Sequence, residues 1–90
     1  MLNIEHTTRF KSDLSLAKRR QKSLKKIQDV MEKIAAEKPL DKKFRDHALS
    51  GDWQSFRECH IEPDWLLIYK ITPDKKTVIF VRTGTHSDLF

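Results

Sequence analysis

Cysteine, glycine and proline are scarce in this sequence of 90 residues, which contains one cysteine, two glycines and three prolines. The single cysteine, Cys59, excludes an intramolecular disulfide and a cysteine-based zinc cluster, and it fits a reducing cytoplasm. With so few glycines and prolines, long disordered segments are not expected. The length of the chain predicts one small domain, residues 1–90, and is too short for two domains. The core of such a domain is too small to bury a cofactor.

Long hydrophobic runs are also absent. The longest apolar run covers residues 65–69, whereas a helix that spans a bilayer needs about 20 apolar residues. The first residues lack the basic and then apolar order of a secretory signal, because Glu5 and His6 interrupt them. We expect no membrane partner and a cytoplasmic location.

Positive charge is concentrated in the first half of the chain. Residues 1–47 contain 13 Lys and Arg against 7 Asp and Glu, whereas residues 48–90 contain 5 against 6. Such asymmetry indicates a polyanion or an acidic protein as a partner. A basic helix face exposed to solvent would give the same composition, so charge alone leaves both readings open.

Two segments of the first half have the periodicity of amphipathic helices. Apolar residues recur every three or four positions over residues 10–17 and, more strongly, over residues 24–34. Pro39 stops the second pattern. We predict helices at residues 8–21 and 23–37, joined tightly as an antiparallel hairpin.

Four further segments have the pattern of strands. They cover residues 1–6, 53–61, 65–71 and 77–83. Short turns join the last three, which favours an antiparallel meander with the apolar segment 65–71 at its centre. Residues 38–52 are expected to form an extended loop, and the first strand to join an edge of the sheet. This order predicts an α+β fold of two layers, with the N-terminal strand and helical hairpin packed on the meander.

Residues able to transfer protons or bind phosphate lie near the predicted strand ends and in the loop. They are His47, His60, Asp64, Arg82 and His86. The first and third strands of an antiparallel meander end at the same edge, so the last four of these residues can converge. Cleavage of RNA without a metal requires a base for the 2′-hydroxyl, an acid for the leaving 5′-oxygen and a cation for the phosphorane. Histidine, carboxylate and arginine can supply these groups.

Each of these residues also has an ordinary structural reading. The histidines can be surface or capping residues, and Asp64 can simply form the turn that contains it. Arg82 can pair with Glu58 or Glu62 across the sheet. These alternatives stay open from the sequence alone.

Other combinations of residues are less suited to chemistry. Cys59 and His60 are adjacent in a predicted strand and so point to opposite faces, which excludes a nucleophile–base dyad. Cys59 is better read as a small buried residue. The indole of Trp65 and the ring of Phe90 can pack in the core instead of stacking on bases. No tight ligand motif supports a metal site, which would have to use His47, His60, Asp64 and His86.

Three stretches carry a more specific pattern: residues 46–51, 56–70 and 81–90. The second contains His-x-x-Pro-Asp-Trp at residues 60–65, and the third contains Arg-Thr-Gly-Thr-His at residues 82–86. With these motifs the chain resembles the YafQ-type toxins of the RelE superfamily, bacterial mRNA interferases of type II toxin–antitoxin systems. The resemblance spans nearly the whole chain, although the helical half matches mainly in pattern.

The resemblance implies a RelE-like, microbial-ribonuclease-like fold and endonucleolytic cleavage of mRNA in the ribosomal A site. It also implies a cognate antitoxin, with the free toxin a monomer and the neutralised toxin a hetero-oligomer. The functional positions of the family correspond to His47, His60, Asp64, Trp65, Arg82, His86 and Phe90. One departure is Ala48, where the family often has proline, and this change loosens the loop that carries His47.

We therefore expect a ribosome-dependent endoribonuclease that needs no metal or other cofactor. His86 is expected to be the leading acid or base, and His60 and Asp64 to share the complementary proton transfer or orient the substrate. Arg82 would stabilise the phosphorane, and His47 would position the phosphate or assist as a second acid.

The remaining residues would bind RNA. Trp65 and Phe90 would shape the base-binding surface. Basic residues of the helices would bind ribosomal RNA electrostatically; they are Lys18, Arg19, Arg20, Lys22, Lys25 and Lys26. The alternative is a non-catalytic basic module that binds RNA or DNA, or a toxin homologue that has lost activity.

Overall fold

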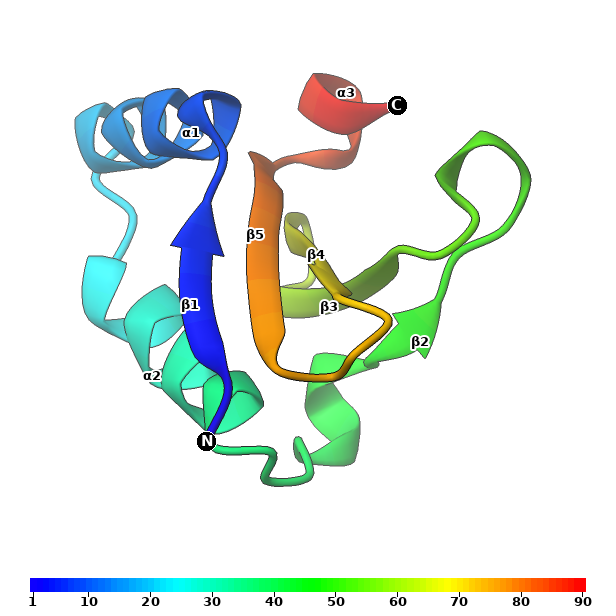
Figure 1. Cartoon of the computed structure of the whole chain (residues 1–90). Helices are drawn as coiled ribbons and strands as arrows, with labels where there is room; N and C mark the ends of the chain where they lie inside the picture. Colours follow the sequence, from blue (N-terminus) through cyan, green and yellow to red (C-terminus); the bar gives the residue numbers. More distant parts are fainter.

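The computed structural model describes residues 1–90 as a five-stranded mixed sheet with helices packed on it (Figure 1). The strands are β1 (Asn3–His6), β2 (His47–Ala48), β3 (Arg57–Glu62), β4 (Trp65–Ile71) and β5 (Thr77–Gly84), in the order β1-β5-β4-β3-β2. Strand β1 pairs in parallel with β5, and the other neighbours are antiparallel. The predicted meander, its central strand and the edge position of the first strand are confirmed.

The two long helices are α1 (Thr8–Arg19) and α2 (Leu24–Ala35). The side chains of Thr7 and Ser23 cap them by accepting hydrogen bonds from backbone N–H groups of the first turns. Both helices end earlier than predicted, because Gln21 and Glu37 adopt positive φ angles of 62° and 59°. A left-handed residue ends a helix regardless of the apolar pattern. Neither helix has the length and apolar character needed to cross a membrane.

The larger apolar core lies between these helices and one face of the sheet. It joins side chains of α1 and α2 to alternate residues of the strands, among them Phe10, Ile27, Cys59, Trp65, Leu67 and Phe80. Cys59 is fully buried, as expected, and burial raises the pKa of its thiol to about 12. Burial on this face favours one register of the outer strands, because a slip by one residue would turn buried side chains such as Cys59 and Phe80 away from the helices.

A smaller apolar cluster covers the opposite face. Leu66 and Ile68 of β4 pack there against Leu89 of the short C-terminal helix α3 (His86–Leu89). A capping box begins α3: the Thr85 side chain accepts from the Asp88 N–H, and the Asp88 carboxylate accepts from the Thr85 N–H. This cluster and cap place His86 at the end of β5.

The region before β3 differs from the prediction. Residue 53 was expected to open a strand, but Trp53 belongs to a 3-10 helix, η2 (Gly51–Trp53), and β3 begins only at Arg57. Ser55 has a φ of 78°, which breaks extended backbone, and the Trp53 ring lies 5.5 Å from Phe56 on the second face. The expected loop also contains the 3-10 helix η1 (Lys42–Phe44) and the short β2.

Candidate active site

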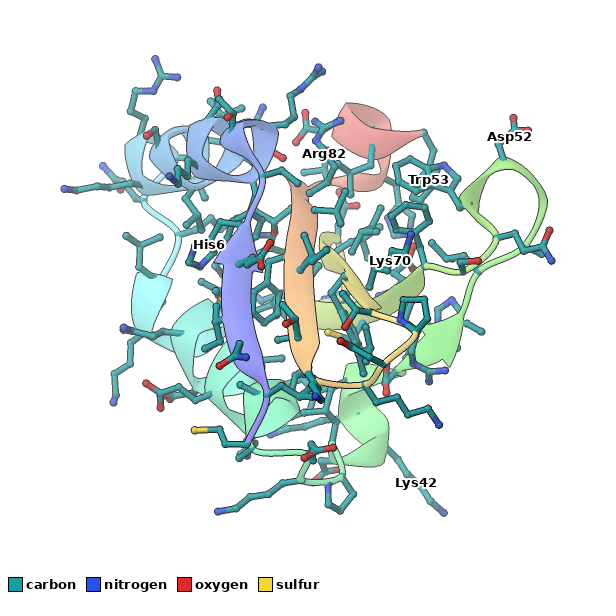
Figure 2. All side chains as sticks on the ribbon, in the orientation of Figure 1. His6, Lys42, Asp52, Trp53, Lys70 and Arg82 are labelled. Carbon is teal, nitrogen blue, oxygen red and sulfur yellow. The ribbon has the colours of Figure 1, made fainter.

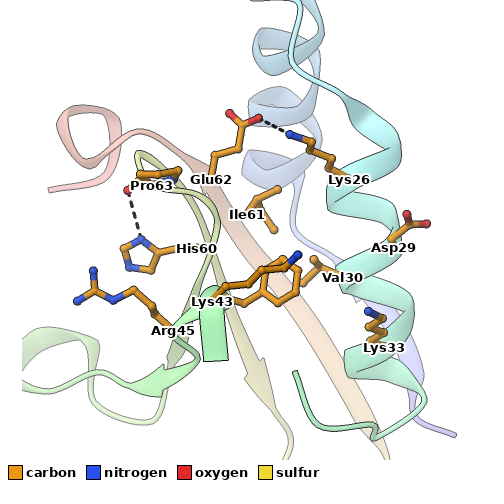
Figure 3. A pocket seen from close by; sticks show the side chains of 11 residues that line it. Lys26, Asp29, Val30, Lys33, Lys43, Arg45, His60, Ile61, Glu62 and Pro63 are labelled. Atoms are coloured by element: carbon orange, nitrogen blue, oxygen red, sulfur yellow. Dashed lines mark hydrogen bonds and ion pairs between the residues drawn. The ribbon is translucent and has the colours of Figure 1, made fainter. Parts of the chain in front are cut away.

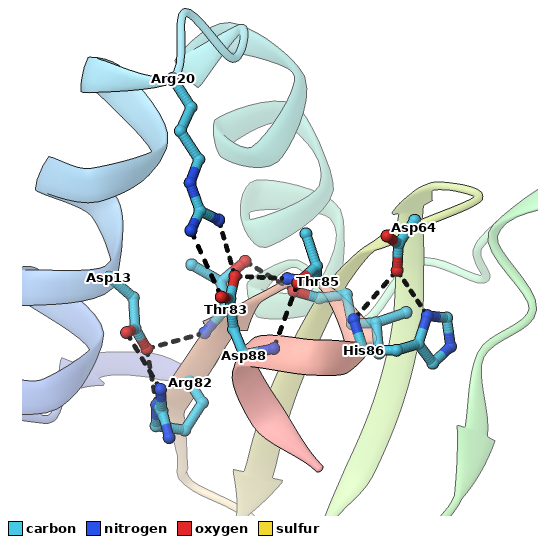
Figure 4. A network of polar contacts seen from close by, with 9 residues as sticks. Asp13, Arg20, Asp64, Arg82, Thr83, Thr85, His86 and Asp88 are labelled. Carbon is cyan, nitrogen blue, oxygen red and sulfur yellow. Dashed lines mark hydrogen bonds and ion pairs between the residues drawn. The ribbon is translucent and has the colours of Figure 1, made fainter.

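His86 and Asp64 form the contact that joins the C-terminal tail to the β3–β4 turn. The Asp64 Oδ1 atom accepts from the His86 backbone N–H at 2.9 Å and lies 2.6 Å from the His86 Nδ1 atom (Figure 4). These contacts, led by the backbone N–H, hold the pKa of Asp64 below its usual value. Asp64 therefore stays ionised near neutral pH and fixes the imidazole with its Nε2 atom free.

Three imidazoles form a row along this edge of the molecule. The His60 ring centroid lies 5.8 Å from that of His86 and 6.3 Å from that of His47. The three rings come from β2, β3 and α3, so the row forms only after the sheet has assembled. The side chain of His60 is 10% exposed, whereas those of His47 and His86 are 49% and 56% exposed. The outer two rings are thus accessible to a substrate.

Glu58 lies beneath this row and was not among the predicted site residues. Its side chain is 7% exposed, and its Oε1 atom lies 3.4 Å from His60 Nε2 and 3.7 Å from His47 Nε2. Glu58 and His60 share a face of β3 because they are two residues apart, and β2 pairing sets His47 opposite Glu58. The spacing of two residues between Glu58 and His60 in a predicted strand is the sequence signal that could have identified Glu58 as a site residue.

Arg82 is not free to join the row. Its guanidinium binds Asp13 of α1, with Nε 2.7 Å from Oδ2 and Nη2 3.2 Å from Oδ1. The same carboxylate accepts from the Thr83 backbone N–H at 3.1 Å. Figure 4 shows Arg82 and Asp13 on the α1 side of the tail, away from His86 and Asp64.

The expectation that Arg82 converges with the histidines is therefore wrong for this structure. An irregularity in the β4–β5 pairing at Ile68 and Tyr69 accompanies this arrangement. Figure 2 shows Arg82 near the end of β5, close to α1. The alternative pairings with Glu58 or Glu62 do not form either: Glu62 binds Lys22 and Lys26, and Glu58 lies beside His47 and His60.

The two aromatic candidates have different environments. Trp65 is 2% exposed and packs in the helix-facing core, so its predicted part in a base-binding surface is wrong for this structure. Its indole N–H has no hydrogen-bond partner. Phe90 is 58% exposed, and its ring meets the Trp53 ring edge-on at 5.8 Å. Phe90 is therefore accessible for stacking and does not fill the core.

The Arg20–Asp88 ion pair holds the tail against α1. The Arg20 Nη1 atom lies 2.7 Å from the Asp88 Oδ2 atom. The Arg20 hydrogen bond, together with the Thr85 backbone N–H, holds the pKa of Asp88 well below its usual value. A Cβ atom at Gly84 would lie 2.9 Å from the Asp88 side chain, so glycine permits this close approach.

A basic groove of about 570 Å³ begins at His60 and runs between α2, η1 and the β3–β4 turn (Figure 3). Lys26 and Lys22 bind Glu62 at 3.0 and 2.9 Å, and these bonds lower the pKa of the Glu62 carboxyl. The groove also contains three cations without an ion-pair partner. They are Lys33, Lys43 and Arg45.

The other predicted RNA-binding cations lie on the two long helices or in the connection between them. Lys18 and Arg19 are exposed, Lys22 is half-buried, and Lys25 is exposed and pairs with Asp29 at 3.8 Å. Figure 2 shows nitrogen-tipped side chains projecting from α1 and α2 away from the sheet. No group of three or more His, Cys, Asp and Glu side chains is arranged to hold a metal ion.

Comparison with known proteins identifies the family. Residues 2–90 match the family model of YafQ, a bacterial toxin of type II toxin–antitoxin systems. The chain belongs to the YafQ toxin family. It is 40% identical over 89 residues to the mRNA interferase toxin YafQ of Escherichia coli K12, covering 98% of this chain and 95% of that protein.

Solved structures agree with this assignment. A metal-bound toxin from Helicobacter pylori is 42% identical, with a TM-score of 0.93 and coverage of 100% of both chains. YafQ in the E. coli DinJ–YafQ toxin–antitoxin complex is 40% identical, with a TM-score of 0.90 and coverage of 99% of this chain and 97% of that chain. The α+β fold predicted from the sequence is therefore that of the YafQ toxins.

Proposed function

We propose that this YafQ-family toxin is an mRNA interferase that cuts mRNA in the ribosomal A site by metal-independent transesterification. The row of His47, His60 and His86, with Asp64 fixed against His86, carries this proposal. Proton donors and acceptors at this spacing suit a reaction that needs a base and an acid on opposite sides of one phosphate. The E. coli relative is named an mRNA interferase, which supports the same substrate class.

In this mechanism the ribose 2′-oxygen loses its proton and attacks the adjacent phosphorus. The bond from phosphorus to the 5′-oxygen breaks, and that oxygen takes up a proton, which leaves a 2′,3′-cyclic phosphate. His86 acts through its free Nε2 atom, since Asp64 holds Nδ1 and stabilises the charged ring. His47, whose side chain is 49% exposed, is the second proton-transfer group.

The negative charge of the phosphorane requires a nearby cation. Asp13 holds Arg82 in the free toxin, so Arg82 can serve only after that ion pair opens. Figure 3 shows the unpaired Arg45 beside His60 at the mouth of the basic groove. Arg45 therefore supplements the predicted role of Arg82 in binding the phosphate.

Two partners are proposed: ribosomal RNA, from the charge of the helices, and an antitoxin, from the complexes of related toxins. The exposed cations Lys18 and Arg19 of α1 and Lys25 of α2 would contact ribosomal RNA, together with the half-buried Lys22 between the two helices. A cognate antitoxin would neutralise the toxin, because YafQ of E. coli forms a complex with DinJ. We expect the free toxin to be a cytoplasmic monomer.

Primer extension on mRNA from an in vitro translation reaction tests the activity. We expect His86→Ala to lower the cleavage rate at least about 100-fold, which is a typical contribution of a general acid or base. Lys76→Ala is the matched control, because it removes a charge from an exposed position of the β4–β5 loop, outside the proposed site, and should retain most of the cleavage.

Cleavage by His86→Ala at the wild-type rate would contradict the catalytic role. Ribosome binding by the wild-type chain without any cleavage would favour a non-catalytic RNA-binding module. Cleavage of naked RNA at the same rate would contradict ribosome dependence.

A further inference from the structure

Glu58 is a buried carboxylate whose only close partners are two histidines. No other group lies within hydrogen-bond or ion-pair distance of its side chain, and Oε1 faces the Nε2 atoms of His60 and His47 at 3.4 and 3.7 Å. A carboxylate that is 7% exposed is costly to leave without a compensating charge. The two imidazoles are the groups available for this compensation.

The other nitrogen of each ring is already committed. His60 Nδ1 lies 3.3 Å from the Pro63 carbonyl oxygen, and His47 Nδ1 lies 2.6 Å from the Arg45 carbonyl oxygen. A carbonyl oxygen only accepts hydrogen bonds, so Nδ1 carries the proton in both rings. If a ring were neutral, its Nε2 atom would point a lone pair at an oxygen of Glu58. A proton between them removes this repulsion.

We propose that Glu58 keeps one proton on the pair of imidazoles near neutral pH, with His60 as the imidazolium. His60 is favoured over His47 because it is closer to Glu58, and its lower exposure strengthens their attraction. Glu58 is then a positioning residue for the RNA cleavage proposed above, and the inference rests on that function for its catalytic consequence. A charged His60 supplies positive charge at the middle of the row while Asp13 holds Arg82.

The surrounding groups determine whether this charge is stable. On the same face, Asp64 at the turn and Glu58 on β3 favour a charged His60. Arg45, which lies beside His60, opposes it, and so does His86 whenever its own ring is charged. On the opposite face, Arg57 of β3 is neutralised by Asp46 at 3.2 Å. Further charges at the groove come from Lys43 of η1, from Glu62 of β3, and from Lys26, Lys33 and Asp29 of α2. Lys70 of β4 lies over the Phe56 ring on the same face as His60.

Nitrogen-15 NMR of the histidine rings tests the protonation state directly. In the wild-type toxin, the His60 ring is expected to show the charged pattern, with both nitrogens protonated, near neutral pH. In Glu58→Gln, the amide can donate to a neutral Nε2 atom, so His60 should show the neutral Nδ1–H tautomer. Glu32→Gln removes the same charge from an exposed position of α2 and should leave the His60 signals unchanged.

The pH dependence of single-turnover cleavage on ribosomes tests the catalytic consequence. In Glu58→Gln, the alkaline limb of the pH–rate profile should move to lower pH. At a pH where the wild type is still active, the rate of Glu58→Gln should be at least about 10-fold below its own maximum, because one pH unit changes a protonated fraction about tenfold. Glu58→Asp keeps a carboxylate and should restore the alkaline limb, even at a reduced maximal rate. A merely structural role would lower the rate without moving this limb.

Neutral rings at both His47 and His60 in the wild-type toxin near neutral pH would overturn the proposal. An unshifted alkaline limb in a folded Glu58→Gln variant would refute the positioning role. If the NMR result holds but the wild-type toxin cuts no RNA at any pH, the proposed function fails while the shared proton stands. Thermal unfolding of each variant establishes that it is folded, and the wild-type spectrum decides the protonation state even if Glu58→Gln does not fold.

Discussion

Replacing Asp13 by alanine should destabilise the fold through the loss of one ion pair. The side chains of Arg82 and Asp13 are 17% and 11% exposed, and the carboxylate accepts two bonds from the guanidinium and one from Thr83. Fully buried pairs cost 3–5 kcal/mol to break, whereas exposed pairs contribute about 1 kcal/mol or less. For this partly buried pair we expect a loss of about 2–4 kcal/mol in the free energy of unfolding. A loss of that size would lower Tm by about 10–25 °C in a domain of this length.

Urea unfolding and a double-mutant cycle with Arg82→Ala measure this contribution. The coupling energy should be about 1.5–3 kcal/mol, because each single variant leaves the other charge without its partner. Asp29→Ala is the matched control: it also removes a helix carboxylate, but its pair with Lys25 spans 3.8 Å and is exposed. We expect that control to lose about 0.5 kcal/mol or less. A loss below about 1 kcal/mol for Asp13→Ala, or a coupling near zero, would refute the stabilising role of the Asp13–Arg82 ion pair.

Three further predictions concern the tail, the core and the cysteine. The pKa of the Asp88 carboxyl is lowered in the folded chain, so its contribution to stability is complete above the unfolded pKa of about 4 and is lost as pH falls through the folded value. Below about pH 4, the free energy of unfolding measured with urea should therefore fall more steeply with decreasing pH for the wild type than for Asp88→Asn. Parallel plots of this free energy against pH would contradict the contribution of Asp88. Trp65→Ala should lower the free energy of unfolding by about 3–5 kcal/mol, because the indole is buried. Trp65→Phe should fold and cut mRNA at a rate within about threefold of wild type. A folded Trp65→Phe variant without activity would instead support the predicted role of Trp65 in binding bases. The Cys59 thiol should react with a thiol reagent only after unfolding, since it is buried and its pKa is raised to about 12, and rapid labelling of the native protein would contradict that burial.

Local patterns in the sequence predict most of the fold. Helix periodicity placed both helices, and the continuous apolar segment 65–71 placed the central strand. The helix ends were missed because the left-handed residues there are not glycines. Trp53 was assigned to a strand because an aromatic residue near a turn fits either structure, and only packing with Phe56 decides between them.

The candidate site was predictable where one sheet edge brings residues together. Antiparallel pairing alone places His60, Asp64 and the tail at one edge, and the structure has that arrangement. Glu58 was weighed only as a surface partner for Arg82, because strand alternation does not show which histidines pack above it. The Asp13–Arg82 pair joins residues 69 positions apart, and no local pattern reveals such a contact.

Contacts between the two ends of the chain also order events during synthesis. Thr7, Asp13 and Arg20 bind Val81, Arg82 and Asp88, respectively, at sequence separations of 74, 69 and 68 residues. A ribosome must therefore make almost all of the described chain before any of these bonds can form. His86 belongs to the last of these segments to emerge, so a nascent chain has no complete row of histidines. The row of histidines can therefore be completed only after the ribosome has made the chain as far as His86.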